Sequence, residues 1–175
     1  MSEIQIAWLE LLMVGGLGGI LILVGIGSNI NTKKKNASCT AVTNGIVVKH
    51  SFNGEGRMAP IVEFSADDQT YRTKKKYNGI KSMSITGLPN AIKGSAWEDE
   101  KGWLHVKTGT FANMRQMAEN LWPIGSEMTV YYNPGNPKKN YVDRPITNQF
   151  VLIIFVIMGA VCVALGILVF LLIQI

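Results

Sequence analysis

Phe150–Ile173 reads FVLIIFVIMGAVCVALGILVFLLI, and none of its side chains is charged. At a rise of about 1.5 Å per residue, a helix of this length crosses a hydrocarbon core about 30 Å thick. Ala7–Gly27 is a second apolar stretch, in which Glu10 is the only charged residue. The composition agrees, because 47% hydrophobic residues and a mean hydropathy of +0.19 are high for a soluble protein. We therefore expect an integral membrane protein with two transmembrane helices.

These two stretches divide the chain into four parts. Residues 1–6 form a short tail, residues 7–30 and 149–175 form the transmembrane helices, and residues 31–148 form a soluble domain between them. Short alternating apolar runs separated by turn residues favour antiparallel β structure in this domain. The expected fold is therefore two transmembrane α-helices flanking a small antiparallel β-rich (α+β) soluble domain.

Basic residues indicate the orientation in the membrane. All 17 Lys and Arg lie between the apolar stretches, in a chain of formal charge +5, and Lys33, Lys34 and Lys35 directly follow the first stretch. Basic residues near the ends of a span stay in the cytoplasm, so we expect a cytoplasmic domain with both termini outside the plasma membrane. The three lysines are expected to contact lipid headgroups. No aromatic-rich nucleic-acid module accompanies the charge, so no nucleic-acid partner is expected.

Small residues in the apolar stretches predict close packing of helices. Gly15 and Gly19 lie about one turn apart in the first stretch, and Gly159 and Gly166 share a stripe with Cys162 in the second. The two surfaces are suited to packing on each other, to a homo-oligomer or to a partner's helix, and the pattern leaves these three alternatives open.

Alternation within the soluble domain predicts which residues share a face of each strand. The expected sets are Val42, Ile46 and Val48; Val62 and Phe64; Leu104 and Val106; and Met128, Val130 and Tyr132. Ala66–Gln69 is expected to form a turn, and Asn133–Pro137 is expected to end the last of these strands.

One amphipathic helix is expected within the β pattern, from about Phe111 to Leu121. Thr110 is the expected N-cap, and Pro123 marks the end of the helix. We expect the apolar face to cover the domain's own sheet, with docking to a partner or to lipid as the alternative.

Together these features resemble a known family. The pattern comprises a span, a strand ending at Val48, the segment Pro60–Phe64, Tyr71 after a turn, and Met128–Pro137 (MTVYYNPGNP) before a second span. It resembles the largely bacterial family called domain of unknown function 3592, in which two spans flank a small β domain ending in a Tyr-Asp/Asn-Pro-x-Asn-Pro turn. The resemblance implies the same layout, and it implies no reaction, ligand or catalytic residue.

The chain departs from this family at two places. Asp67-Asp68-Gln69 lacks the usual turn glycine, and Asn78–Asn120 is longer than the corresponding stretch. Long irregular stretches in compact domains are often functional, so we expect this insert (78–120) to supply a partner-binding surface. Trp97 or Trp103 is the expected aromatic anchor, and the alternative is that both only complete the core.

No pattern predicts a catalytic, cofactor or metal site. His50 and His105 lack the spacings of metal ligands, and a nucleophilic Cys39 would need a histidine base beside it. Glu98–Glu100 is expected to be a solvated turn that opens a hairpin. Cys162 lies within an apolar stretch, so a disulfide with Cys39 is not expected.

The leading hypothesis is a non-enzymatic membrane-anchored interaction protein that presents a basic β-rich domain at the membrane surface. Its expected partners are the lipid bilayer and another protein, and a homo-oligomer is possible. The alternative is an accessory or immunity subunit that acts through its membrane helices on a pore, a transporter or a membrane-active toxin. Glu10 is expected at headgroup depth beside Trp8, rather than in an ion path. A membrane-bound enzyme is the third hypothesis.

Overall fold

The computed structural model describes residues 3–53, 57–85, 94–109 and 113–173. The chain forms two compact units. The helix unit comprises Met1–Lys34 and Thr147–Ile175, and the β unit comprises Lys35–Ile146. The expected arrangement of two long apolar helices flanking a β-rich region is thereby confirmed.

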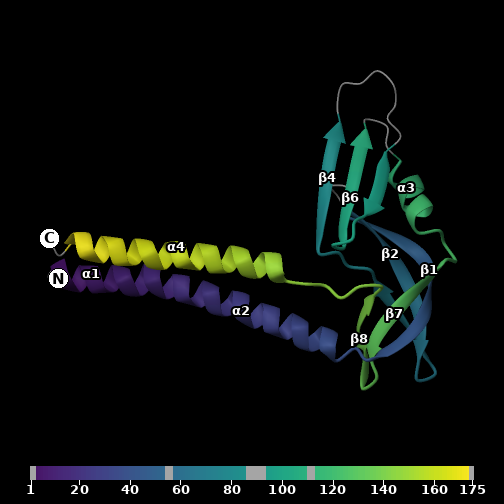
Figure 1. Ribbon diagram of the computed structural model, residues 1–175, viewed down its shortest axis with the longest axis horizontal. Coiled ribbons are helices and arrows are strands. Elements are labelled where there is room, and N and C mark those ends of the chain that lie inside the picture. The colour runs from purple at the N-terminus through teal and green to yellow at the C-terminus, as the bar shows by residue number, and fades with distance from the viewer. Residues whose placement is uncertain (1–2, 54–56, 86–93, 110–112, 174–175) are drawn as a thin grey trace. The chain divides into compact units, whose positions relative to one another are not determined.

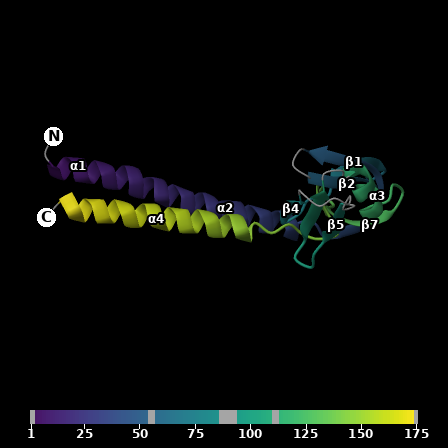
Figure 2. The ribbon, with the colours of Figure 1, turned by 90° about the horizontal axis from the view of Figure 1, so that it is seen from above.

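The helix unit contains two long helical segments. The first consists of α1 (Glu3–Glu10), the π-helical turn η1 (Leu11–Gly15) and α2 (Gly16–Ala37), and the second is α4 (Gln149–Ile173). Both are long and apolar enough to cross a membrane, judged by length and composition. Figure 1 and Figure 2 show the two segments side by side and antiparallel, with the N- and C-termini at the same end of the unit.

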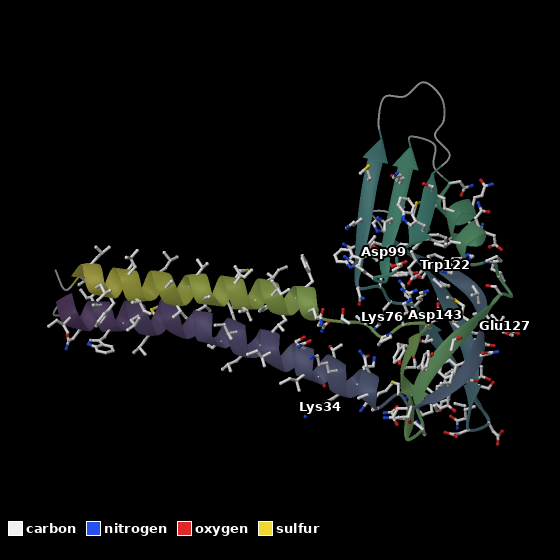
Figure 3. The ribbon with its side chains drawn as sticks, viewed as in Figure 1. Lys34, Lys76, Asp99, Trp122, Glu127 and Asp143 are labelled. Carbon is white, nitrogen blue, oxygen red and sulfur yellow. The ribbon has the colours of Figure 1, made fainter. Side chains whose placement is uncertain are left out.

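The helix α2 is longer than the sequence suggests. The expected boundary was Ile30, whereas α2 continues through Lys33, Lys34 and Lys35 to Ala37. No glycine or proline interrupts residues 28–37, and lysines near a helix C-terminus interact favourably with the helix dipole. The three lysines therefore project from the last turns of a helix, where Figure 3 labels Lys34.

A five-stranded antiparallel sheet forms most of the β unit. Its strand order is β3-β2-β1-β7-β8, and the strands are β1 (Ala41–Asn53), β2 (Arg57–Ala66), β3 (Gln69–Lys74), β7 (Glu127–Asn133) and β8 (Asn136–Val142). The sheet is curled, and its two edge strands approach each other where Thr73 Oγ1 on β3 donates a hydrogen bond of 2.5 Å to Asn140 Oδ1 on β8.

Two hairpins of this sheet involve the turns expected from the sequence. The turn between β2 and β3 is confirmed: Asp67 and Asp68 both adopt left-handed backbone conformations, with φ of 50° and 57°. Aspartate tolerates this conformation better than most residues, which explains how the turn forms without glycine. The second turn ends β7 at Asn133 as expected, and the chain returns at once as β8 from Asn136, so Asn136 and Pro137 already belong to the next strand.

A second, three-stranded sheet lies within residues 78–120. Its order is β4-β6-β5, with β4 (Gly79–Ile85), β5 (Ser95–Glu98) and β6 (Trp103–Gly109). The β5–β6 pair is the expected hairpin, but β4 runs parallel to β6. A purely antiparallel arrangement was therefore wrong. Parallel strands meet through a long connection rather than a tight turn, so no local turn signal reveals this pairing.

Both sheets contribute to one hydrophobic core. Its fully buried members include Val62 on β2, Leu104 and Val106 on β6, and Val130 on β7, as the alternating patterns predicted. The rest of the cluster consists of Val47, Met58, Phe64, Ala66, Met117, Ala118, Trp122 and Val142. The segment 78–120 is thus a structural layer of the β unit as well as an exposed surface.

The face expected to unite Val42, Ile46 and Val48 on β1 is the outer one. Val42 and Ile46 are 56% and 50% exposed, whereas Val47 is fully buried. Gly45 is also buried, and a Cβ at that position would lie 2.5 Å from Val62 Cγ1. The inward Gly45 carries no apolar side chain, so the apolar alternation on β1 marks the outer face, and the register shift between Val47 and Lys49 interrupts it at Val48.

The helix α3 (Met114–Leu121) packs against the hydrophobic core of the β unit, and Figure 1 shows it beside the three-stranded sheet. The N-cap is Asn113, not Thr110: the Asn113 side chain accepts hydrogen bonds from the backbone of Arg115 and Gln116. Thr110 and Phe111 lie outside the described residues. Met117 and Ala118 are buried against the core, so α3 covers the domain's own sheets as expected.

Candidate functional site

The outer surface of the three-stranded sheet gathers aromatic and basic side chains. Leu104 and Val106 on β6 point into the core, and successive strand residues point to opposite faces. Cross-strand registers place the outward residues beside one another. We call this surface the basic aromatic face, and its members are Lys81, Met83, Ser95, Trp97, Trp103, His105 and Lys107.

Trp97 is the exposed anchor of this face. Its side chain lies on the cross-strand neighbour His105, with the ring centroids 5.0 Å apart and the planes nearly parallel. The ammonium of Lys107 lies 5.2 Å from the Trp97 ring. Trp97 remains 39% exposed, so it is available to a partner and does not complete the core.

Trp103 has a more structural position. Its ring covers Gly79 on the neighbouring strand, where an added Cβ would come within 2.2 Å of the indole. Lys81 lies over the same ring, with Nζ 5.3 Å from its centroid. The tryptophan that completes the core is Trp122, which lies directly after α3 and is 5% exposed. The two tryptophans singled out from the sequence therefore differ in their roles.

The negative charge nearest the face is Asp99, in the turn between β5 and β6. Asp99 Oδ2 lies 2.9 Å from His105 Nε2, and Oδ1 accepts hydrogen bonds from the backbone of Trp103 and Lys101. The hydrogen bond with His105 and that from Trp103 lower the pKa of the Asp99 carboxyl. None of the outward members of the face is a carboxylate, so the face presents net positive charge.

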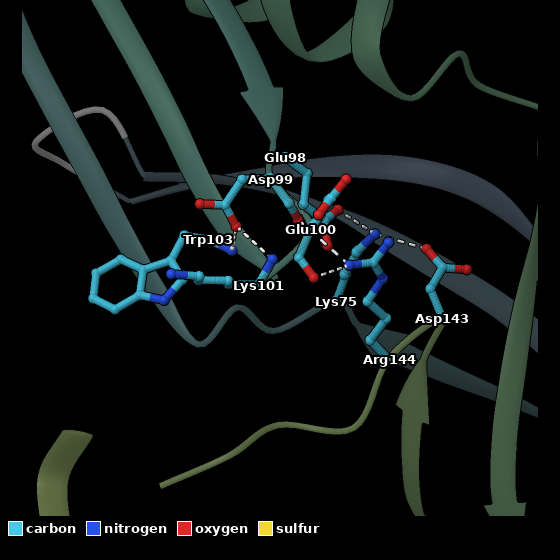
Figure 4. Close-up of polar contacts among 8 residues, drawn as sticks. All are labelled: Lys75, Glu98, Asp99, Glu100, Lys101, Trp103, Asp143 and Arg144. Carbon is cyan, nitrogen blue, oxygen red and sulfur yellow. Dashed lines mark hydrogen bonds and ion pairs between the residues drawn. The ribbon is translucent and has the colours of Figure 1, made fainter. Parts of the chain in front are cut away.

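An ion cluster, formed by Lys75, Glu98 and Asp143, lies beneath the β5–β6 turn (Figure 4). The Lys75 side chain is 5% exposed, and Nζ lies 2.7 Å from Glu98 Oε2 and 2.6 Å from Asp143 Oδ2. The cluster joins the end of β3, the small sheet and the end of β8. The expectation of a solvated turn at Glu98–Glu100 was therefore wrong for Glu98, whose strand position turns it inward.

A cavity of about 330 Å³ adjoins the ion cluster, lined by Lys75, Glu98, Asp99, Glu100, Asp143 and Arg144. Arg144 Nη1 donates to the backbone oxygen of Glu100 at 2.5 Å and so holds the turn. The Tyr77 hydroxyl is buried and has no hydrogen-bond partner among the described residues. Burial, followed by the charges of Glu98 and Asp143, raises the Tyr77 pKa, so this phenol stays protonated. Since Lys75 and Arg144 already have partners, this arrangement favours a structural role.

The other residues with catalytic potential are also held by structural contacts. His50 is buried, with Nε2 2.7 Å from the Trp122 carbonyl oxygen. The Cys39 thiol donates to the carbonyls of Lys35 and Lys139, and burial raises its pKa, which disfavours the reactive thiolate. Within the described ranges, no group of three or more His, Cys, Asp or Glu side chains is arranged to hold a metal ion.

Contacts within the helix unit involve three of the four expected glycines. A Cβ at Gly159 would lie 2.6 Å from the Gly18 carbonyl oxygen, and one at Gly166 would lie 3.2 Å from the Gly15 nitrogen. Gly19 has open space beside it instead. Gly18, which precedes Gly19 in the sequence, lies against Gly159 instead. The packing of both helices together determines which side of the first helix faces the second.

The ion cluster was missed from the sequence, although one signal pointed to Lys75. Tyr71, Thr73 and Lys75 share one side of the chain as it leaves β3, and all three are at least partly buried. Its two acidic partners come from distant parts of the chain and have no local signal.

No protein-family model, curated protein or solved structure matches this chain, so the resemblance to domain of unknown function 3592 stays a prediction.

Proposed function

We propose that the protein is a non-enzymatic, membrane-anchored interaction protein that binds a partner through the basic aromatic face. The single observation that carries this proposal is the face itself. Met83 and Trp97 are 57% and 39% exposed beside Lys81 and Lys107, and no described strand or helix covers them. Exposed aromatic and apolar groups flanked by charge are typical of recognition surfaces.

Membrane anchoring is supported by the two apolar helices, whose outer surfaces remain open. Only 11% of the most apolar window of each helix is buried within the protein. A helix that is apolar all round and unburied is suited to lipid. The proposed topology places the β unit in the cytoplasm and both termini outside the plasma membrane, because Lys33, Lys34 and Lys35 end the first helix. This layout also agrees with the proposed membership of domain of unknown function 3592.

The proposal is tested by crosslinking the full-length protein in cells, followed by detergent purification and mass spectrometry. A Trp97→Ala, Lys107→Gln variant should lose a protein or lipid that the wild-type chain retains. Ile124→Ala is the matched control, since Ile124 is 57% exposed but lies outside the face. The proposal is wrong if both variants retain the same partners as the wild-type chain.

A second candidate function acts through the helix unit, and Glu10 is the observation that favours it. Glu10 Oε2 is buried and has no hydrogen-bond partner within the described residues. It directly precedes the π-helical turn η1, and such turns often mark functional positions. An ionisable group within a membrane helix is expected to serve a function, here on a pore, a transporter or a membrane-active toxin.

Glu10→Gln and Gly19→Leu test this candidate, because neither change should disturb the contact between the helices. Gly19 has open space around it, whereas Gly18 does not. If both variants keep every helix-dependent partner that the wild-type chain crosslinks, the intramembrane function is excluded. The hypothesis of an enzyme acting on lipid or peptide gains no supporting arrangement from the described residues.

A further inference from the structure

We propose that the partner of the basic aromatic face is the anionic phospholipid surface of the membrane that holds the protein. This inference rests on the proposed function, since it names the ligand of the same face. It makes the β unit a peripheral lipid-binding domain in addition to the two helices that anchor it.

The charges of the face suit anionic headgroups. Lys81 and Lys107 are exposed, on β4 and β6 respectively, and they flank His105. Two carboxylates lie beside the face at the β5–β6 turn: Asp99 is hydrogen-bonded by His105 and by two backbone amides, and Glu100 precedes Lys101, which lines the same hollow beside Lys81 and Trp103. Lys81 and Lys107 together with Lys101 outnumber the carboxylates of Asp99 and Glu100, so this surface keeps a net positive charge for phosphate groups. Each such lysine strengthens attraction to an anionic leaflet about fivefold.

The apolar members of the face suit the boundary between headgroups and acyl chains. Met83 and Trp97 are both exposed, and each lies beside Lys107, which is the cross-strand neighbour of Met83 and lies over the Trp97 ring. Lys107 lies over the Trp97 ring, so the ammonium group and the indole would meet a docked bilayer at the same depth. Tryptophan and lysine together are typical of segments that lie in the membrane interface.

The tether makes even a weak surface effective. Both ends of the β unit continue directly into the long apolar helices, at Lys35 and at Ile146. Binding of the face to the same bilayer is therefore an intramolecular event with a high effective concentration of lipid. An acidic protein would satisfy the same charges, but it must be recruited, whereas the bilayer is linked to the β unit through the chain itself.

The test uses the full-length protein in nanodiscs. Met83→Cys, in a Cys39→Ser, Cys162→Ser background, carries a fluorophore whose emission is quenched by lipids with nitroxide-labelled acyl chains. Ile124→Cys is the matched control, because both positions are 57% exposed. Discs of phosphatidylcholine alone are compared with discs of equal parts phosphatidylcholine and phosphatidylglycerol, and thermal unfolding shows that each variant is folded.

We expect several-fold stronger quenching at position 83 than at position 124, and only in discs with phosphatidylglycerol. Lys81→Gln and Lys107→Gln should each lower the ratio of docked to undocked protein about fivefold. Equal quenching at the two positions, or equal quenching in both kinds of disc, overturns the inference. If that happens while Trp97 still determines a crosslinked protein partner, the proposed function stands with a protein as the ligand; if neither holds, both fail.

Discussion

The ammonium group of Lys75 is held between two carboxylates inside the β unit. Lys76, the next residue along the chain, is exposed. Of these two adjacent lysines, the first is therefore buried in ion pairs and the second faces solvent. Removing a buried charge leaves its former partners unpaired, and here Glu98 and Asp143 would also repel each other.

Lys75→Ala should lower the free energy of unfolding by about 3 kcal/mol, the lower end of the range for a broken buried pair. The lower end applies because the side chains of Glu98 and Asp143 keep 19% and 31% exposure. Denaturant unfolding of the detergent-solubilised chain, followed by tryptophan fluorescence, measures the change. Lys76→Ala is the matched control and should have little effect; equal effects of the two substitutions would contradict the assigned role.

Asp99 predicts a pH dependence. Hydrogen bonds from His105 and from the Trp103 backbone lower its pKa in the folded protein. A carboxyl with a lowered pKa adds stability that is fully present above the pKa of the unfolded chain, about 4, and lost as the pH falls through the folded value.

Asp99→Asn should therefore remove part of the loss of stability that the wild-type chain shows below about pH 4. Melting temperatures across acidic pH measure this in both proteins. Asp68→Asn serves as the control, since Asp68 is exposed and asparagine also tolerates its left-handed conformation. A parallel pH profile for Asp99→Asn and the wild-type chain would show that this hydrogen bond contributes nothing.

At the scale of elements, α3 illustrates how a cap is identified. Asn113 is followed by Gln116 at the third helical position, a spacing that is typical of a helix start. Thr110 also satisfies the cap preference in the sequence, and the structure shows the Asn113 side chain accepting hydrogen bonds from the backbone amides of Arg115 and Gln116. The amphipathic pattern identified the helix, and the Asn113 cap marks its start.

Asn113→Ala should destabilise the β unit by about 1 kcal/mol, whereas Asn113→Asp should preserve the cap. Thermal unfolding of the full-length protein in detergent measures both. Asn120→Ala, in the last turn of the same helix, controls for the general effect of alanine on helix propensity. If Asn113→Ala behaves like Asn120→Ala, the cap does not stabilise the helix.

The helix pair makes a second prediction at this scale. Gly18→Leu should separate α2 from α4, because a Cβ at Gly18 would lie 2.6 Å from the Gly159 carbonyl oxygen. Gly19→Leu should not separate them. The reporter is a disulfide between Trp8→Cys and Phe170→Cys, which replace rings 5.0 Å apart, in a chain with serine at both native cysteines. Similar disulfide yields in the two glycine variants would refute the observed contact.

For the whole molecule, the proposed topology is testable with one exposed cysteine. Cys39 is unsuitable as a reporter because its thiol is buried. Lys138→Cys, in a Cys39→Ser, Cys162→Ser background, places a thiol on the exposed start of β8. An impermeant maleimide should label it only after the cells are permeabilised. Ser2→Cys is the reverse control and should react in intact cells; labelling of position 138 in intact cells would invert the topology.

Local signals in the sequence determined the main elements of this protein. Uncharged runs predicted the long helices, and alternation predicted the buried residues of β2, β6 and β7, because both patterns depend only on neighbours along the chain. The paired aspartates, Asp67 and Asp68, predicted their turn for the same reason.

Tertiary structure alone decided the features that depend on distant residues. The parallel pairing of β4 with β6, the contact of Gly18 with Gly159 and the burial of Lys75 each join segments far apart in the chain. The two expected anchors, Trp97 and Trp103, look alike in sequence, yet one covers Gly79 while the other stays exposed. Their surroundings differ because each side chain meets the neighbour that the strand register places opposite it.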